Sequence, residues 1–141
     1  MEKNVSAAMT EEDVLRDYSG AALAYLGDGV MELLVRERFL KKGNMQAEKY
    51  HRNVTAVVNA RSQAAAVEQL MDRLTEKEKD AYRRGRNASV HTRAKSATLG
   101  EYKKATGLEA LFGFLYLTGQ RARMDSLLDE IMGGSGESNE L

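Results

Sequence analysis

The sequence of 141 residues contains neither cysteine nor proline. Without cysteine the chain can form no disulfide and can offer no thiolate to a metal ion, which fits a reducing compartment such as the cytoplasm. Without proline, no segment carries the residue that most strongly breaks helices. Isoleucine is also scarce, with one residue against 18 alanines, and this balance disfavours strands. These absences together predict an all-α fold.

Long hydrophobic runs are missing as well. The first residues lack the apolar core of a signal peptide, and no stretch reaches the roughly 18 apolar residues that a membrane span requires. We therefore expect a cytoplasmic protein without membrane association. The length suits one compact domain, which we expect at residues 1–132. Residues 133–141 begin with Gly-Gly-Ser-Gly and have little apolar surface, so we expect them to form a disordered acidic tail.

The charges balance in total but not along the chain. There are 21 basic and 21 acidic residues. Residues 82–104 carry seven basic residues and one acid, whereas residues 125–141 carry five acids and no base. A basic segment of this kind is either a solvated face or a surface that binds a phosphate-bearing polymer.

Apolar residues recur at helical spacing over most of the chain. Thr10 and Thr75 precede acidic first turns and predict two helix starts. The first expected helix runs from Thr10 to about Tyr18, and the second follows it and ends at about Leu40. Three more are expected from about Gln46 to Leu74, from Thr75 to near Gly85, and from Gly100 or Glu101 to Thr118. A last amphipathic helix contains Ile131. Residues 86–96 lack an apolar period and are expected to form an exposed loop.

The helix over residues 23–40 is apolar around much of its circumference, so we expect it to be largely buried. Asp28 lies in its middle, between Gly27 and Gly29. Each glycine costs about 1 kcal/mol inside a helix, and an unpaired buried carboxylate costs several more. Two interpretations remain open. Either the glycines admit a neighbouring helix and Asp28 pairs with a buried arginine, or the three residues serve a function.

Glu109 is a second lone acid in an apolar helix. If the two apolar helices pack together in the centre of a bundle, Asp28 and Glu109 meet, and two adjacent anions need a proton or a cation between them. Oxygen ligands without cysteine favour Mg²⁺, which suits phosphodiester hydrolysis. Salt-bridged core acids are the alternative. The basic segment supports the hypothesis of a magnesium site that acts on a phosphate-bearing polymer.

Two long motifs resemble the ribonuclease III family. L-A-Y-L-G-D-G-V-M-E-L at 23–33 resembles the signature of its nuclease domains, and A-T-G-L-E-A-L-F-G-F-L-Y-L at 105–117 resembles its second motif. R-R-G-R-N-A at 83–88 and Tyr102-Lys103 resemble the short bacterial Mini-ribonuclease III branch, which lacks a double-stranded-RNA-binding domain. The resemblance covers the chain from about Tyr18 to about Leu128.

The resemblance implies the helical bundle of a ribonuclease III endonuclease domain. It implies a homodimer that cuts double-stranded RNA with Mg²⁺, each subunit cleaving one strand. For the short branch it implies maturation of the large-subunit (23S) ribosomal RNA precursor, with a ribosomal protein as a further candidate partner. By motif position, Asp28 and Glu109 are implied to be the catalytic acids and the metal ligands.

Two positions depart from the pattern of the full-length enzymes. Their further carboxylates, four residues before the aspartate and three before the glutamate, are replaced here by Ala24 and Thr106. The site is therefore poorer in negative charge. This keeps open an alternative function, a non-catalytic structured-RNA-binding or ribosome-associated protein on the same fold. A plain helical interaction module, with the acids as core ion pairs, is a third hypothesis.

Other candidates are weaker. Glu32, one helical turn after Asp28, is either a further ligand or the partner of Arg36, and the spacing favours the ion pair. Neither His51 nor His91 has the spacing of metal ligands. The resemblance to the short branch implies a catalytic domain without an appended binding domain, so we expect this domain itself to hold A-form RNA through phosphate and 2′-hydroxyl contacts. The expected RNA-binding residues are Arg83, Arg86, Asn87, Arg93 and Lys95.

Overall fold

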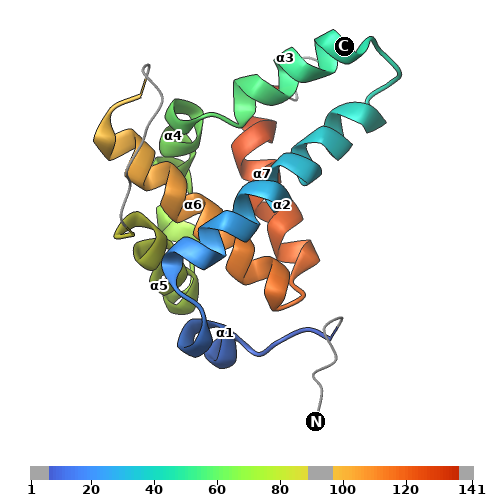
Figure 1. Cartoon of the computed structure of the whole chain (residues 1–141). Helices are drawn as coiled ribbons and strands as arrows, with labels where there is room; N and C mark the ends of the chain where they lie inside the picture. Colours follow the sequence, from blue (N-terminus) through green and yellow to red (C-terminus); the bar gives the residue numbers. More distant parts are fainter. Residues whose placement is uncertain (1–6, 89–96, 137–141) are drawn as a thin grey trace.

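Helices form every regular element of residues 7–88 and 97–136, the part of the chain that the computed structural model describes (Figure 1). The all-α prediction is confirmed. None of the helices in these ranges has the length and hydropathy of a membrane span. The elements are α1 (Glu11–Asp17), α2 (Gly20–Lys41), α3 (Ala47–Val57), α4 (Ala60–Leu70), the 3-10 turn η1 (Met71–Arg73), α5 (Glu76–Arg86), α6 (Leu99–Leu117) and α7 (Arg121–Gly136).

Helix α6 lies at the centre of the bundle. Helices α2, α4, α5 and α7 all pack against it (Figure 1). Five of its apolar residues have no solvent-accessible surface, namely Ala110, Leu111, Phe112, Phe114 and Leu115. A helix that is apolar nearly all round can be buried on every side, which is why this sequence becomes the core.

Helix α2 is buried on one face only. Met31 and Val35 lie in the core, with exposed fractions of 2% and 0%. Tyr25, Leu33 and Leu40 are exposed by 86%, 63% and 59%. The expectation that this helix is largely buried was therefore wrong for its outer face. An apolar period shows where hydrophobic surface lies, but it does not show whether the same chain covers that surface.

The predicted helix starts at Thr10 and Thr75 are confirmed. Thr10 accepts a hydrogen bond from the backbone of Asp13, and Thr75 forms a reciprocal capping box with Glu78. Helix α6 also begins with a capping box, formed by Thr98, so it starts at Leu99. Each cap satisfies backbone N–H groups that have no partner inside the helix.

The single helix expected from Gln46 to Leu74 was wrong, because Asn59 divides it. The Asn59 backbone is extended, and its side-chain oxygen accepts from the backbone N–H of Ser62 at 2.9 Å to cap α4. Its amide nitrogen also donates to the carbonyl of Thr55 at 2.8 Å, at the end of α3. Asparagine competes for backbone groups in this way and therefore favours helix ends. The break lets α4 turn away from α3 and pack against α6.

Helix α7 continues to Gly136, past the residue at which we expected the tail to begin. Residues 137–141 lie outside the described part of the chain, so the disordered tail stays a prediction. The division of the chain into a domain at 1–132 and a tail at 133–141 likewise stays a prediction, with the helix end now at Gly136.

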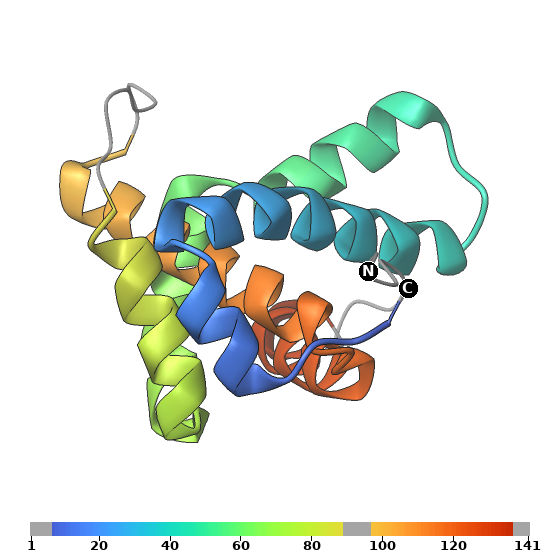
Figure 2. The same ribbon diagram turned by 60° about the horizontal axis from the view of Figure 1, so that its bottom comes forward.

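Two glycines let α2 and α6 cross at backbone contact (Figures 1 and 2). A Cβ atom built on Gly27 would lie 1.6 Å from the carbonyl oxygen of Glu109, and one on Gly113 would lie 2.1 Å from that of Leu23. Neither position can hold a side chain at this separation. Gly29 differs, because a Cβ there would meet nothing within 4 Å. The interpretation that glycine admits a neighbouring helix is therefore confirmed for Gly27.

Substitution of these glycines tests the crossing. We expect Gly27→Ala to lower the free energy of unfolding by at least about 3 kcal/mol, because the added methyl group forces the backbones apart. The matched variant Gly29→Ala should raise it by up to about 1 kcal/mol, since alanine is the better helix former in open space. Urea unfolding followed by circular dichroism measures both. Equal effects of the two substitutions would contradict the crossing geometry.

Candidate active site

The crossing of α2 and α6 brings Asp28 and Glu109 together. Asp28 follows Gly27, whose backbone touches the main chain of Glu109. The two carboxyl groups are close enough to repel each other and to share a hydrogen bond. Asp28 is exposed and Glu109 is only partly buried. The expectation of two buried acids is thus corrected for Asp28, because the neighbouring turn of α2 faces solvent.

Electrostatics at this site act most strongly on Glu109. Burial raises the pKa of its carboxyl, repulsion from Asp28 raises it further, and the result is about 7 instead of 4.5. A hydrogen bond from the amide of Gln63 acts in the opposite direction and lowers the pKa. A carboxyl group with such a pKa lacks a compensating cation.

Neither acid forms an ion pair with lysine or arginine within residues 7–88 and 97–136. The alternative of core salt bridges for Asp28 and Glu109 is therefore not found there. Glu32, one turn after Asp28, does pair: its Oε2 lies 2.6 Å from Nη2 of Arg36. The expected ion pair of Glu32 is confirmed.

The donors at this site fit a hard divalent cation such as Mg²⁺. Two adjacent carboxylates supply oxygen ligands only, and Mg²⁺ needs one or two carboxylates because it keeps several waters. The described residues contain no group of three or more acidic, histidine or cysteine side chains that could hold a metal. Ala24 is buried, and the hydroxyl of Thr106 donates to the carbonyl of Tyr102 in its own helix, so neither position adds a ligand.

Sequence reasoning missed Gln63 as a residue of the site. Its side chain is 4% exposed, and its amide nitrogen donates to Oε2 of Glu109 at 3.3 Å. The signal was present in the sequence. Gln63 falls three residues after Ala60 and four before Val67, which places an amide on the apolar face of the expected helix. A polar residue on such a face usually needs a buried partner.

The expected RNA-binding residues divide into two sets. Arg83, Arg86 and Asn87 lie at the C-terminal end of α5, where the backbone at Gly85 packs against α6 one turn before Glu109. Arg83 and Asn87 are exposed, and the guanidinium of Arg86 lies 5.7 Å from the centre of the Tyr82 ring. The remaining two, Arg93 and Lys95, lie outside the described residues, as does His91. His51 is exposed on α3.

The pKa of Glu109 predicts a pH dependence of stability. Because the folded chain holds this proton up to about pH 7 and the unfolded carboxyl releases it near 4.5, stability falls as the pH rises between these values, and the full cost is present above pH 7. Glu109→Gln removes the titrating group. Its melting temperature should exceed that of the wild type at pH 8, by on the order of 5 °C, and approach it at pH 4.5.

Thermal unfolding at both pH values without divalent ions measures this difference. A gap between the variant and the wild type that is the same at both pH values would contradict the assignment, because it would then not come from ionisation of Glu109.

Known proteins match this chain over most of its length. Residues 21–120 match the Ribonuclease III domain family. Mini-ribonuclease 3 of Symbiobacterium thermophilum is 49% identical over 106 residues, 75% of this chain and 82% of that protein. Mini-ribonuclease 3 of Enterococcus faecalis is 40% identical over 131 residues, which are 89% of this chain and 99% of that protein. A crystal structure of a Fusobacterium nucleatum protein is similar to this chain with a TM-score of 0.79 and 33% sequence identity. The similarity covers 86% of this chain and 97% of that one.

The matched family region contains both Asp28 and Glu109 and the helices that carry them. The two curated relatives match over most of their own length, so the similarity is not confined to a fragment. The comparisons favour an enzyme over the non-catalytic alternative. The chain belongs to the ribonuclease III family, with Mini-ribonuclease 3 proteins among its relatives, and is an endoribonuclease.

Proposed function

We propose that the chain cleaves double-stranded RNA at a Mg²⁺ site formed by Asp28 and Glu109. Enzymes of the ribonuclease III family generally depend on divalent metal ions and act on double-stranded RNA as dimers. The proposed process is maturation of the large-subunit (23S) ribosomal RNA precursor in the cytoplasm. The support for this process is the resemblance of residues 83–88 to the short bacterial branch of the family.

One observation carries the proposal. Two carboxyl groups from different helices are neighbours in a partly solvated place, and no cationic side chain of residues 7–88 or 97–136 neutralises them. Repulsion of this kind costs stability, so a folding role does not account for it. A divalent cation at the same place relieves the repulsion and uses both groups as ligands.

The residues of the chain would each have a defined part in the reaction. Asp28 and Glu109 would hold the ion, and Glu109 must lose its proton to do so. A bound Mg²⁺ polarises a phosphoryl oxygen and lowers the pKa of an attacking water. The exposed side of Asp28 leaves room for the RNA backbone. Gly29 has open space beside it and carries no side chain that would block this approach.

The end of α5 is suited to hold the RNA beside the acids. Arg83 is exposed and forms no ion pair with the described residues, so its charge is available to a phosphate. Arg86 and Asn87 extend the same helix end. A-form RNA offers phosphates and 2′-hydroxyl groups across a shallow groove, which arginine and asparagine can contact without reading sequence. Arg93 and Lys95 are proposed to continue this surface.

The outer face of α2 and the adjoining α3 are suited to a homodimer. These two helices extend together from one side of the bundle (Figures 1 and 2). Leu33 and Leu40 are exposed there, and they line a cavity of about 580 Å³ with Tyr50 and Val54. Exposed apolar surface of this kind typically marks an interface. A second copy would cover it, and each subunit would cleave one strand.

The acids can be tested by isosteric substitution. We expect Asp28→Asn and Glu109→Gln each to lower cleavage of double-stranded RNA by more than about 100-fold, because loss of even an outer partner of a metal ligand costs about 10- to 100-fold. Both variants should stay folded and still bind RNA. Cleavage by the wild type should also stop when Mg²⁺ is chelated.

The matched control is Glu32→Gln, because Glu32 is one turn from Asp28 and pairs with Arg36. This variant should retain activity. If it lost as much activity as Asp28→Asn, the assignment of the metal site would be wrong. Gel analysis of cleavage products over time measures all three variants.

The helix end can be tested through the salt dependence of RNA binding. Each lost phosphate contact should reduce the slope of log binding constant against log salt concentration by about one unit. We expect this change for Arg83→Ala and for Arg86→Ala. Arg16→Ala is the control, since Arg16 pairs with Asp13 and Asp17 in its own helix. A slope that either α5 variant leaves unchanged would remove that residue from the RNA surface.

A further inference from the structure

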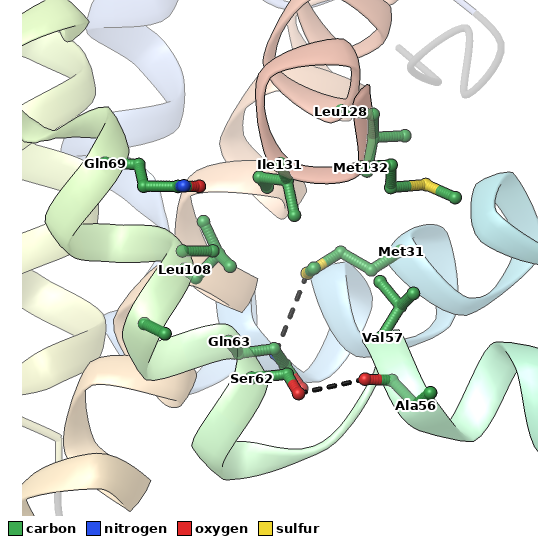
Figure 3. Close-up of a pocket in the computed structure, with 12 residues that line it drawn as sticks. Met31, Ala56, Val57, Ser62, Gln63, Gln69, Leu108, Leu128, Ile131 and Met132 are labelled. Atoms are coloured by element: carbon green, nitrogen blue, oxygen red, sulfur yellow. Dashed lines mark hydrogen bonds between the residues drawn. The ribbon is translucent and has the colours of Figure 1, made fainter. Parts of the chain in front are cut away.

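Gln63 occupies an unusual place beside the two acids. It lies in the first turn of α4 with 4% of its surface exposed, and its amide nitrogen has two acceptors: Oε2 of Glu109 at 3.3 Å and Sδ of Met31 at 3.8 Å. Figure 3 shows Gln63 and Met31 turned toward one another at the wall of a cavity of about 260 Å³. The side chain thus lines this cavity and also contacts Glu109.

Packing alone does not account for an amide at this position. The neighbours that line the cavity beside it include Met31, Leu108 and Ala66, which are apolar. Burial of an amide among apolar groups costs free energy unless strong hydrogen bonds compensate, and a thioether is a weak acceptor. An unbranched apolar side chain of similar volume would fill the same space. The remaining partner is the carboxylate of Glu109, and the hydrogen bond to it compensates the burial of the amide.

The contact fixes Oε2 of Glu109, and Asp28 is the other side chain of the described residues that acts on this carboxyl group. A glutamate side chain in a helix has several rotamers, and a buried donor at Oε2 selects among them. The main chain of Glu109 is already held by the close approach of Gly27. Backbone and side chain of Glu109 are therefore held by α2 and α4 respectively, while Asp28 lies on the exposed side.

We propose that Gln63 is a positioning residue, whose buried amide orients the carboxylate of Glu109 so that its second oxygen can bind the divalent ion. This inference rests on the proposed function, because it requires that Asp28 and Glu109 bind a metal. Hydrogen-bonding partners of metal ligands commonly tune metal affinity in this way, and their loss costs about 10- to 100-fold. Gln63 itself is not expected to touch the ion or the RNA.

The test replaces the amide with an unbranched apolar side chain of similar volume. We expect Gln63→Met to weaken Mn²⁺ binding by the RNA-free protein about 10-fold, measured from the free Mn²⁺ signal in electron paramagnetic resonance titrations. The Mg²⁺ concentration for half-maximal cleavage should rise by a similar factor. RNA affinity in EDTA should not change, and saturating Mg²⁺ should restore most of the cleavage rate. If Gln63→Met does not fold, Gln63→Leu replaces it.

The matched control is Gln69→Leu. Gln69 belongs to the same helix and lines the same cavity, but it is exposed and forms no hydrogen bond with either acid. This variant should bind Mn²⁺ as the wild type does. Wild-type Mn²⁺ affinity in Gln63→Met would overturn the inference. So would a loss of rate that no Mg²⁺ concentration restores and that accompanies lower stability, since that is the result of a merely structural role.

The experiment also separates this inference from the proposed function. If the wild type binds Mn²⁺ and Asp28→Asn abolishes that binding, the metal site stands, and Gln63→Met then decides on the positioning role alone. If the wild type and Asp28→Asn bind Mn²⁺ equally, the metal site is wrong and the inference is overturned with it.

Discussion

The backbone contact between Gly27 and Glu109 is the constraint on which the rest of the site depends. It sets the separation of α2 and α6, and this separation determines how near Asp28 lies to Glu109. Glycine inside a helix is costly, by about 1 kcal/mol relative to alanine. The close packing of two long apolar helices offsets that cost. Gly113 repeats the same arrangement from the opposite helix, so the crossing is held from both sides.

The electrostatics of the site differ from those of the rest of the fold. Glu78 is 2% exposed, and it is fully compensated: Arg123 donates to both of its oxygens at 2.8 Å, and the capping box engages it as well. The chain therefore pairs a buried acid where the fold alone requires it. At Asp28 and Glu109 it does not. Unrelieved repulsion at one place in an otherwise compensated structure is typical of a functional site.

The errors of sequence reasoning arose where a local pattern had two structural outcomes. A run of helical periodicity across residues 46–74 did not reveal the break, although Asn59 is a residue that caps helix ends when its neighbours permit it. The outer face of α2 was expected to be buried because it is apolar. Tyr25 and Leu33 are instead exposed, and the proposed dimer would cover the part of this face that carries Leu33.

The features that the sequence determined by itself depend on interactions between residues close together in the chain. The caps at Thr10 and Thr75 and the pairing of Glu32 with Arg36 depend on residues within about one helical turn, so the local patterns were sufficient to predict them. The motifs also singled out Asp28 and Glu109 before any geometry was known.

Tertiary structure alone decided the exposure of Asp28, the pKa of Glu109 near 7 and the hydrogen bond from Gln63. These properties depend on the solvent and charges that distant segments bring to one place. No local period in the sequence encodes how closely α2, α4 and α6 approach one another, because that distance is set by the packing of all three helices together.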